Sequence, residues 1–225
     1  MAKLVQKSGY IKAGKASGYM RYIATREGVE KLAGNGSVTK GQRELIQKLL
    51  TDFPDAVELF EYEDYCKTPT LGTASAFITM ALDANLHEID SESGYMQYIA
   101  TRPRVQKHGS HGLFSSSTSV DLASAMSELE SHEGNVWTII YSLRREDAAR
   151  LEFDNADAWR TLLMESAPTL AKSMKISLDN FHWYAAFHDE GHHPHIHMMV
   201  WSDDSKEGFL TKDGISAMRS KLTNA

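Results

Sequence analysis

The sequence predicts an α/β fold: a central, mainly antiparallel sheet with helices covering its apolar side and a site on the other. Four segments are rich in β-branched and aromatic residues or alternate apolar with polar side chains, as strands do. Segments between them repeat apolar residues every three or four positions, which is typical of amphipathic helices. The chain has 225 residues, 42% of them hydrophobic, which is enough for one substantial core. Alternation of the two kinds of segment favours a sheet with helices packed on it.

The N-terminal part is expected to contain one strand and three helices. The strand leads into a glycine-containing turn, and the helical segments have apolar residues three and four positions apart. The expected bounds are 4–11 for the strand and 19–31, 45–53 (after Thr39) and 76–86 for the helices.

The C-terminal part is expected to alternate between helix and strand. A Gly/Ser-rich stretch precedes it, and the strands are marked by β-branched and aromatic residues. Its expected elements are a helix from 122 to near Gly134, a strand over 136–143, helical cover over 159–174 broken or restarted at Pro168, a hairpin of 181–188 with 195–201, and a closing helix over 215–222.

Charge is distributed unevenly along the chain, although the net charge is only −6. Residues 1–50 hold ten Lys and Arg against three Glu, whereas residues 51–94 hold one Lys against ten Asp and Glu. Phosphate contacts require Lys and Arg, so the basic segments are the candidates for contact with nucleic acid. The acidic stretch is expected to be a solvated helical insertion, about 41–92, within a single domain spanning 1–225.

Two absences from the sequence bear on the compartment. No apolar run approaches the roughly 20 residues of a membrane span, and the N-terminus lacks the apolar core of a signal peptide. Cys66 is the single cysteine, which excludes an intrachain disulfide. We therefore expect a cytoplasmic protein without membrane insertion.

Three histidines near the C-terminus predict a metal site. Side chains alternate along a strand, so His195 and His197 point to the same side. A tight connection from Asp189 to Pro194 would place His188 across from His195 on a paired strand. Three neutral imidazoles leave the charge of a divalent ion uncompensated, which suits a Lewis acid that polarises a phosphodiester. The alternative is a His-rich hairpin that binds metal adventitiously.

An internal repeat supplies candidate nucleophiles. Ser17–Arg26 recurs as Ser93–Arg102 with nine of ten positions identical, the exception being Arg21, replaced by Gln97. On a helix the two tyrosines and the arginine of each copy fall on one face. Free tyrosine has a pKa of about 10, so a neighbouring guanidinium or cation is needed to favour the phenolate. Each copy supplies such a neighbour, and each aromatic residue could instead pack its helix onto the sheet.

The chain resembles a known family in several blocks. His188, six residues ending in Pro194, and His195-Ile196-His197 are similar to the metal motif of HUH endonucleases in their conjugative relaxase form. The segments KSGYIK, SGYMRYIATREGVEKL, YIATRPRVQKHGSHGLF and NVWTIIYSLRREDAARL resemble the MobP class, particularly MobL-type relaxases. This resemblance implies an HUH-type sandwich whose first strand lies beside the histidine pair and delivers the following helix to the site.

The resemblance also implies an activity: site- and strand-specific nicking of DNA at a plasmid or integrative-element transfer origin. A tyrosine of the first repeat copy would become joined to the DNA 5′ phosphate, with Tyr22 the first candidate and Tyr19 the second. Tyr95 and Tyr98 form a rival pair, and related proteins that use histidine bring His182 into consideration. The other candidate residues are Glu190 as an acid–base or orienting carboxylate, and Arg26, Arg102 and His182 as DNA contacts.

A cofactor and partners follow from the same resemblance. The implied cofactor is a divalent ion. Relaxases generally use Mn or Mg, whereas three imidazoles have the higher intrinsic affinity for Zn, Ni or Cu. The partners are single-stranded or hairpin-flanked origin DNA, relaxosome accessory proteins and a coupling protein. The chain would be either the N-terminal part of a longer protein or a short relaxase. The alternatives are a rolling-circle replication initiator, a metal-binding DNA adaptor without nuclease activity, and a hydrolase that uses metal-activated water.

Overall fold

The computed structural model describes residues 4–10, 36–85, 92–101, 105–107, 110–117, 119–189 and 193–223. The chain divides into two compact units with separate cores. The sheet unit comprises residues 1–11 and 91–225, and the helical unit comprises residues 12–90.

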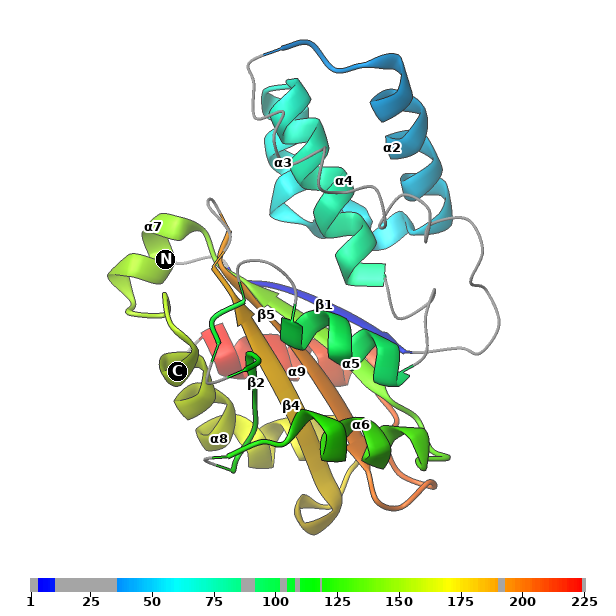
Figure 1. The fold of residues 1–225 in the computed structure, drawn as a ribbon, viewed down its shortest axis with the longest axis vertical. Helices are drawn as coiled ribbons and strands as arrows, with labels where there is room; N and C mark the ends of the chain where they lie inside the picture. Colours follow the sequence, from blue (N-terminus) through cyan, green and yellow to red (C-terminus); the bar gives the residue numbers. More distant parts are fainter. Residues whose placement is uncertain are drawn as a thin grey trace. The chain divides into compact units, whose positions relative to one another are not determined.

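The sheet unit confirms the expected α/β fold, because its described part holds a sheet of five antiparallel strands (Figure 1). Their order across the sheet is β1-β3-β5-β4-β2. The two-residue strand β2 was not expected, since two residues show no period. The bounds are Val5–Tyr10 for β1, Leu113–Phe114 for β2, Trp137–Ser142 for β3, Phe181–His188 for β4 and His195–Ser202 for β5.

The position of β1 differs from the arrangement that the resemblance implies. β1 pairs with β3, which in turn pairs with β5, so β1 is not adjacent to the histidine hairpin. The compositions account for this order. β3 is apolar or aromatic at most positions, which suits a central strand, whereas β1 carries Gln6, Lys7 and Ser8, which suit an edge.

One face of the sheet packs on the helices α8 (Ala156–Ser173) and α9 (Lys212–Thr223) (Figure 1). Alternate residues of the strands point into this core, with Trp183 and Phe187 from β4 and Met198 from β5 among them. On the helix side the largest buried residue is Trp159. The alternation expected for the two hairpin strands is therefore confirmed.

The other face is covered as well, contrary to the expectation that it would be open. The helices α5 (Glu92–Thr101) and α6 (Leu122–Glu130) lie over it (Figure 1). α5 is formed by the second repeat copy, and its contact with the sheet confirms the packing role that the sequence left open for the aromatic residues of that copy. Its apolar side chains Tyr95, Met96 and Ile99 are fully buried, so the helix gains hydrophobic energy by packing on this face.

α8 passes through Pro168 without a break, which corrects the expected interruption. Proline removes one hydrogen bond, the one to the carbonyl four residues earlier. Here Pro168 and Met164 are both exposed, so water can solvate the unsatisfied carbonyl of Met164. The buried residues Leu163 and Leu170 hold the helix on both sides of the proline.

The remaining elements of the sheet unit are short. α7 (Arg145–Arg150) follows β3, and a 3-10 turn, η5 (Leu178–Asn180), leads into β4. α6 begins at its N-cap Asp121 and ends before the Gly134 that was expected to stop it, with Ser131 as its C-cap.

The helical unit contains the helices α2, α3 and α4 and the 3-10 turn η3. α2 starts at Thr39, whose side chain forms a capping box with Gln42. α4 starts earlier than expected because Thr70 and Thr73 exchange side chain-to-backbone hydrogen bonds at its first turn. The bounds are Lys40–Asp52 for α2, Pro54–Glu58 for η3, Phe60–Lys67 for α3 and Leu71–Asn85 for α4.

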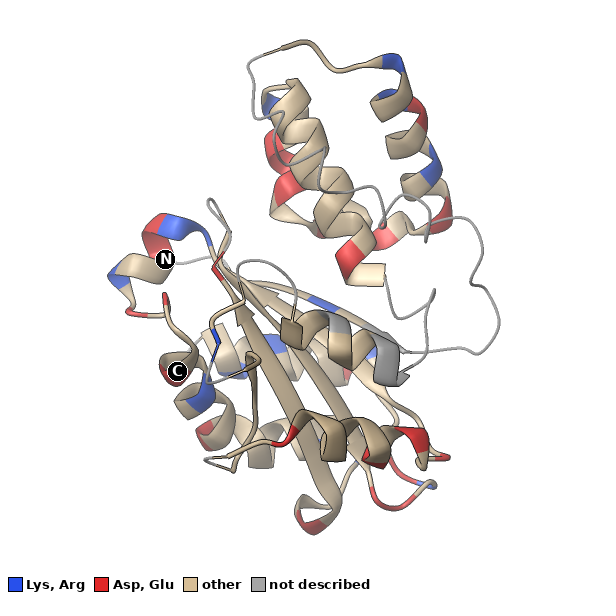
Figure 2. Cartoon of the chain, viewed as in Figure 1, with Lys and Arg blue, Asp and Glu red and all other residues tan. Residues whose placement is uncertain are grey.

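The helical unit has its own core, which includes Leu49, Leu59 and Phe77. Its acidic residues gather on α3 and the ends of the neighbouring elements (Figure 2). Among the described helices of both units, none has the length and hydropathy needed to cross a membrane.

Candidate metal centre

Three histidine side chains converge on the sheet face beneath α5. His188 is paired with His195 across β4 and β5, and His197 follows two residues later on the same face. Their ring centroids lie 4.7 to 5.2 Å apart, and all three residues are fully buried. Neither strand carries a Lys, Arg, Asp or Glu (Figure 2). The hairpin pairing and the shared face expected for these residues are confirmed.

Hydrogen bonds define which nitrogen of each ring can bind a cation. Nε2 of His188 lies 2.8 Å from the carbonyl oxygen of Ile99, and Nδ1 of His195 lies 3.0 Å from that of His193. A carbonyl oxygen only accepts, so these two nitrogens carry the proton. In a neutral ring the opposite nitrogen then holds the lone pair, which is the state that a metal ligand requires.

The triad fits a divalent cation. One nitrogen from each ring lies within 4.8 Å of those of the other two. Around a tetrahedral ion, metal–nitrogen bonds of about 2.0–2.1 Å place the nitrogens roughly 3.4 Å apart, so binding draws the three rings inward. Backbone carbonyls behind the ligands are the usual outer partners of metal-bound histidine.

Tyr95 is the residue at this site whose role the sequence did not reveal. Its hydroxyl lies 3.0 Å from Nδ1 of His197, and the two rings meet edge to face with centroids 6.2 Å apart. Tyr95 is fully buried. The internal repeat singled out this tyrosine as a rival nucleophile or a packing residue, and nothing local connects it to a histidine 102 residues later.

Comparison with known protein families identifies the family of this chain. The model of the MobL relaxases matches residues 1–225, the whole chain. The protein belongs to the MobL relaxase family. The protein is therefore a relaxase. Relaxases are nucleases and strand transferases that nick DNA in conjugation. No curated protein and no solved structure matches the chain.

Several residues expected at the site of this MobL relaxase lie outside the described residues. Tyr98 belongs to α5, but its side chain is not described. The others are the tyrosine candidates Tyr19 and Tyr22, the arginines Arg26 and Arg102, and Glu190.

His182 lies on the triad face of the MobL relaxase but at the other end of β4. Six residues separate it from His188, which corresponds to about 20 Å along a strand. Its ring stacks on Trp201 with centroids 5.9 Å apart, and its Nε2 lies 2.8 Å from a carboxylate oxygen of Asp203. The side chain is 40% exposed. This position disfavours His182 as a nucleophile at the triad.

Asp189, directly after the first histidine, forms an ion pair with Arg145. The guanidinium nitrogen lies 2.6 Å from the carboxylate oxygen, and both side chains are partly exposed. The contact ties the end of β4 to the first turn of α7. Asp189, which neighbours the acid–base candidate Glu190, is therefore occupied in an ion pair.

Lys7 lies on the triad face of the sheet. In the strand register it is paired with Ile140, which is paired with His197. Neighbouring strands are about 4.8 Å apart, so Lys7 and His197 are about 10 Å apart at their backbones. Lys7 is 6% exposed, and the sequence offered no sign that this lysine would be buried on the face of the histidines.

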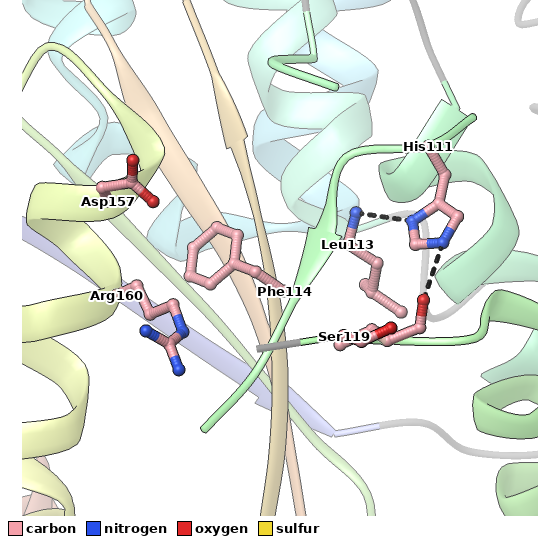
Figure 3. Close-up of a pocket in the computed structure, with 7 residues that line it drawn as sticks. His111, Leu113, Phe114, Ser119, Asp157 and Arg160 are labelled. Carbon is pink, nitrogen blue, oxygen red and sulfur yellow. Dashed lines mark hydrogen bonds between the residues drawn. The ribbon is translucent and has the colours of Figure 1, made fainter. Parts of the chain in front are cut away.

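His111 is not part of the triad. Its Nδ1 accepts a hydrogen bond from the Leu113 N–H, and its Nε2 lies 3.1 Å from the carbonyl oxygen of Val120 (Figure 3). It lines a pocket of about 320 Å³ between β2 and α8, together with Phe114 and Arg160. The spacing of His108 and His111 predicts a surface turn, but the ring of His111 is buried and holds this turn through its two hydrogen bonds. His108 lies outside the described residues.

Proposed function

We propose that this relaxase nicks one DNA strand at a specific site in a transfer origin and remains covalently attached to the 5′ phosphate for strand transfer. The observation that carries the proposal is the buried histidine triad, with two of its rings held in tautomers suited to a cation. His188, His195 and His197 would hold the ion. When bound, a divalent ion supplies Lewis acidity toward non-bridging phosphate oxygens.

The nucleophile is proposed to be Tyr22, with Tyr19 as the second choice. Its phenolate oxygen attacks the phosphorus, the bond from phosphorus to the 3′ oxygen breaks, and the 3′ oxygen leaves as a hydroxyl after taking up a proton. The phosphotyrosine bond preserves the energy of the phosphodiester, so a later 3′ hydroxyl can reverse the step. The family membership supports a tyrosine nucleophile, and the Tyr-Ile context of Tyr22 favours it over Tyr19.

Charged side chains would handle the phosphates and the proton. Lys7, buried on the triad face, supports binding of an anionic backbone there. Arg26 and Arg102 are proposed to contact backbone phosphates. Because Asp189 is engaged by Arg145, Glu190 is the better candidate for taking up or delivering the proton.

The far end of the same sheet face is proposed to contact the bases of single-stranded origin DNA. The ring of His182 stacks on Trp201, and its Nε2 lies within hydrogen-bond distance of a carboxylate oxygen of Asp203. A partly exposed ring held in this way offers a stacking surface for an unpaired base. We also propose a cytoplasmic relaxosome, with accessory and coupling proteins as partners and Mn or Mg as the working ion.

A covalent-adduct assay tests the proposal. Labelled oligonucleotides tiling both strands of the DNA that flanks the gene are incubated with the protein and Mn²⁺, and the products are separated under denaturing conditions. We expect one oligonucleotide to give a protein–DNA adduct and a free 3′-hydroxyl fragment. Peptide mass mapping should locate the adduct on Tyr22, and Tyr22→Phe should abolish it.

Other outcomes would identify a different function. Cut DNA without an adduct would indicate hydrolysis by metal-activated water. Binding without cleavage would indicate a DNA adaptor, and an adduct at a replication origin in place of a transfer origin would indicate a rolling-circle initiator. Each of these results would overturn the proposed nicking and attachment at a transfer origin.

A further inference from the structure

Helix α5 contacts two of the three histidines through residues one helical turn apart. The Tyr95 hydroxyl lies 3.0 Å from Nδ1 of His197, and the Ile99 carbonyl oxygen lies 2.8 Å from Nε2 of His188. Residues four positions apart fall on the same side of a helix, so one face of α5 meets both rings.

The contact to Tyr95 bears on the tautomer of His197. If Nε2 is to bind a cation, the neutral ring must carry its proton on Nδ1, and the Tyr95 oxygen must accept it. We propose that α5 is the positioning helix of the metal centre and that Tyr95 holds His197 with Nε2 directed to the cation. This inference rests on the proposed function, in which the triad binds a divalent ion.

α5 is well fixed for such a role. Tyr95, Met96, Ile99 and Ala100 are all fully buried, and the carbonyl of Ala100 accepts a 2.8 Å hydrogen bond from the Gly112 N–H. Ligand geometry is held best by groups that packing and hydrogen bonds immobilise. The helix can therefore orient two rings without rearranging.

This placement separates the roles of the two repeat copies. The imidazole ring of His197 stands between the Tyr95 hydroxyl, at Nδ1, and a cation bound at Nε2. A cation held there would be separated from the Tyr95 hydroxyl by the imidazole ring, which disfavours Tyr95 as the nucleophile. Tyr95 of the second copy thus orients a ligand, which leaves Tyr22 of the first copy as the proposed nucleophile.

Two measurements on the full-length protein test this role with Tyr95→Phe. Tyr184→Phe is the matched control, because it removes a hydroxyl on the same sheet face that donates to Glu128. Calorimetric titration with Mn²⁺ should show a 10- to 100-fold weaker affinity for Tyr95→Phe, a typical effect of losing an outer partner of a ligand, and no change for Tyr184→Phe. Long-range ¹H–¹⁵N spectra of the metal-free protein should show His197 protonated on Nδ1 in the wild type and altered in Tyr95→Phe.

Adduct formation completes the test. Tyr95→Phe should still form the DNA adduct at saturating Mn²⁺, whereas Tyr22→Phe should bind Mn²⁺ normally and form none. An unchanged affinity and tautomer in Tyr95→Phe, or an adduct mapped to Tyr95, would overturn the positioning role. A wild type that binds no Mn²⁺ would overturn the proposed metal site, and the spectra would still show whether Tyr95 sets the His197 tautomer.

Discussion

At the scale of single residues, this relaxase buries three histidines on two strands that carry no Lys, Arg, Asp or Glu. Burial of a neutral imidazole costs little when its N–H reaches an acceptor, and the carbonyls of Ile99 and His193 provide acceptors for His188 and His195. A charged ligand at the same depth would require a partner before any cation arrived. Three buried neutral ligands are therefore compatible with a stable metal-free fold.

The stacked ring of His182 leads to a prediction about DNA affinity. His182→Ala removes the exposed stacking surface, and base–aromatic stacking contributes about 1–3 kcal/mol per base. We expect roughly 5- to 150-fold weaker binding of single-stranded origin oligonucleotide in fluorescence anisotropy. Mn²⁺ affinity should be unchanged, since the triad is six residues away along β4.

Thr161→Ala is the control for this measurement, because Thr161 is exposed on α8, the helix that covers the opposite face. Equal DNA affinity of His182→Ala and the wild type would show that bases do not stack at this end of the sheet.

At the scale of elements, tertiary packing overrides local propensity in α8. Proline is about 3 kcal/mol less favourable than alanine inside a helix, yet α8 continues past Pro168. The buried residues Trp159, Leu163 and Leu170 anchor the helix to the sheet. Their apolar burial offsets the missing backbone hydrogen bond.

Pro168→Ala should therefore stabilise the protein. The new N–H can donate to the Met164 carbonyl, and we expect the free energy of unfolding to rise by about 1–3 kcal/mol in urea denaturation. Glu165→Ala, an exposed substitution on the same helix, should change it by less than about 0.5 kcal/mol. A loss of stability in Pro168→Ala would mean that the proline stabilises α8 in its present position.

The end of β5 is held by Glu207, which predicts a pH dependence. A hydrogen bond from the Ser202 hydroxyl, with further ones from the Ser177 N–H and the Asn180 amide, lowers the pKa of Glu207 below its usual value. A carboxyl with a lowered folded-state pKa stabilises the fold above its unfolded-state pKa and loses this effect as the pH falls through the folded-state value.

Glu207→Gln should thus unfold at lower urea than the wild type at pH 7, and the difference should shrink as the pH falls below about 4. Urea titrations at several pH values measure this. Glu165→Gln, an exposed control on α8, should match the wild type throughout. A difference that is independent of pH would contradict the role of the Glu207 charge.

At the scale of the whole molecule, two units with separate cores share one chain. The triad, α5 and the five described strands all belong to the sheet unit. Cation binding should therefore act on the stability of that unit.

Mn²⁺ at 100 times its Kd should stabilise the folded sheet unit by about 2.7 kcal/mol. This corresponds to a rise of about 5 to 10 °C in its Tm, measured by calorimetry. His195→Ala should show no such rise, because two imidazoles remain. An equal rise in the wild type and in His195→Ala would place the cation elsewhere.

Prediction from the sequence succeeded where the signal was local. The shared face of His188, His195 and His197 followed from strand alternation and a short connection, both of which operate over a few residues. The start of α2 at Thr39 followed from its capping residue in the same way. The expected interruption at Pro168 was wrong because the energetic cost of a proline in a helix is local, whereas the packing that offsets this cost comes from contacts with the sheet.

The sequence by itself determined the family, the strand and helix periods and the three candidate ligands. Only the tertiary structure decided that the second repeat copy meets those ligands. The two copies differ at a single position, Arg21 against Gln97, so no local property distinguishes their roles. The hydrogen bond between Tyr95 and His197 joins residues 102 positions apart and exists only once α5 packs on the sheet.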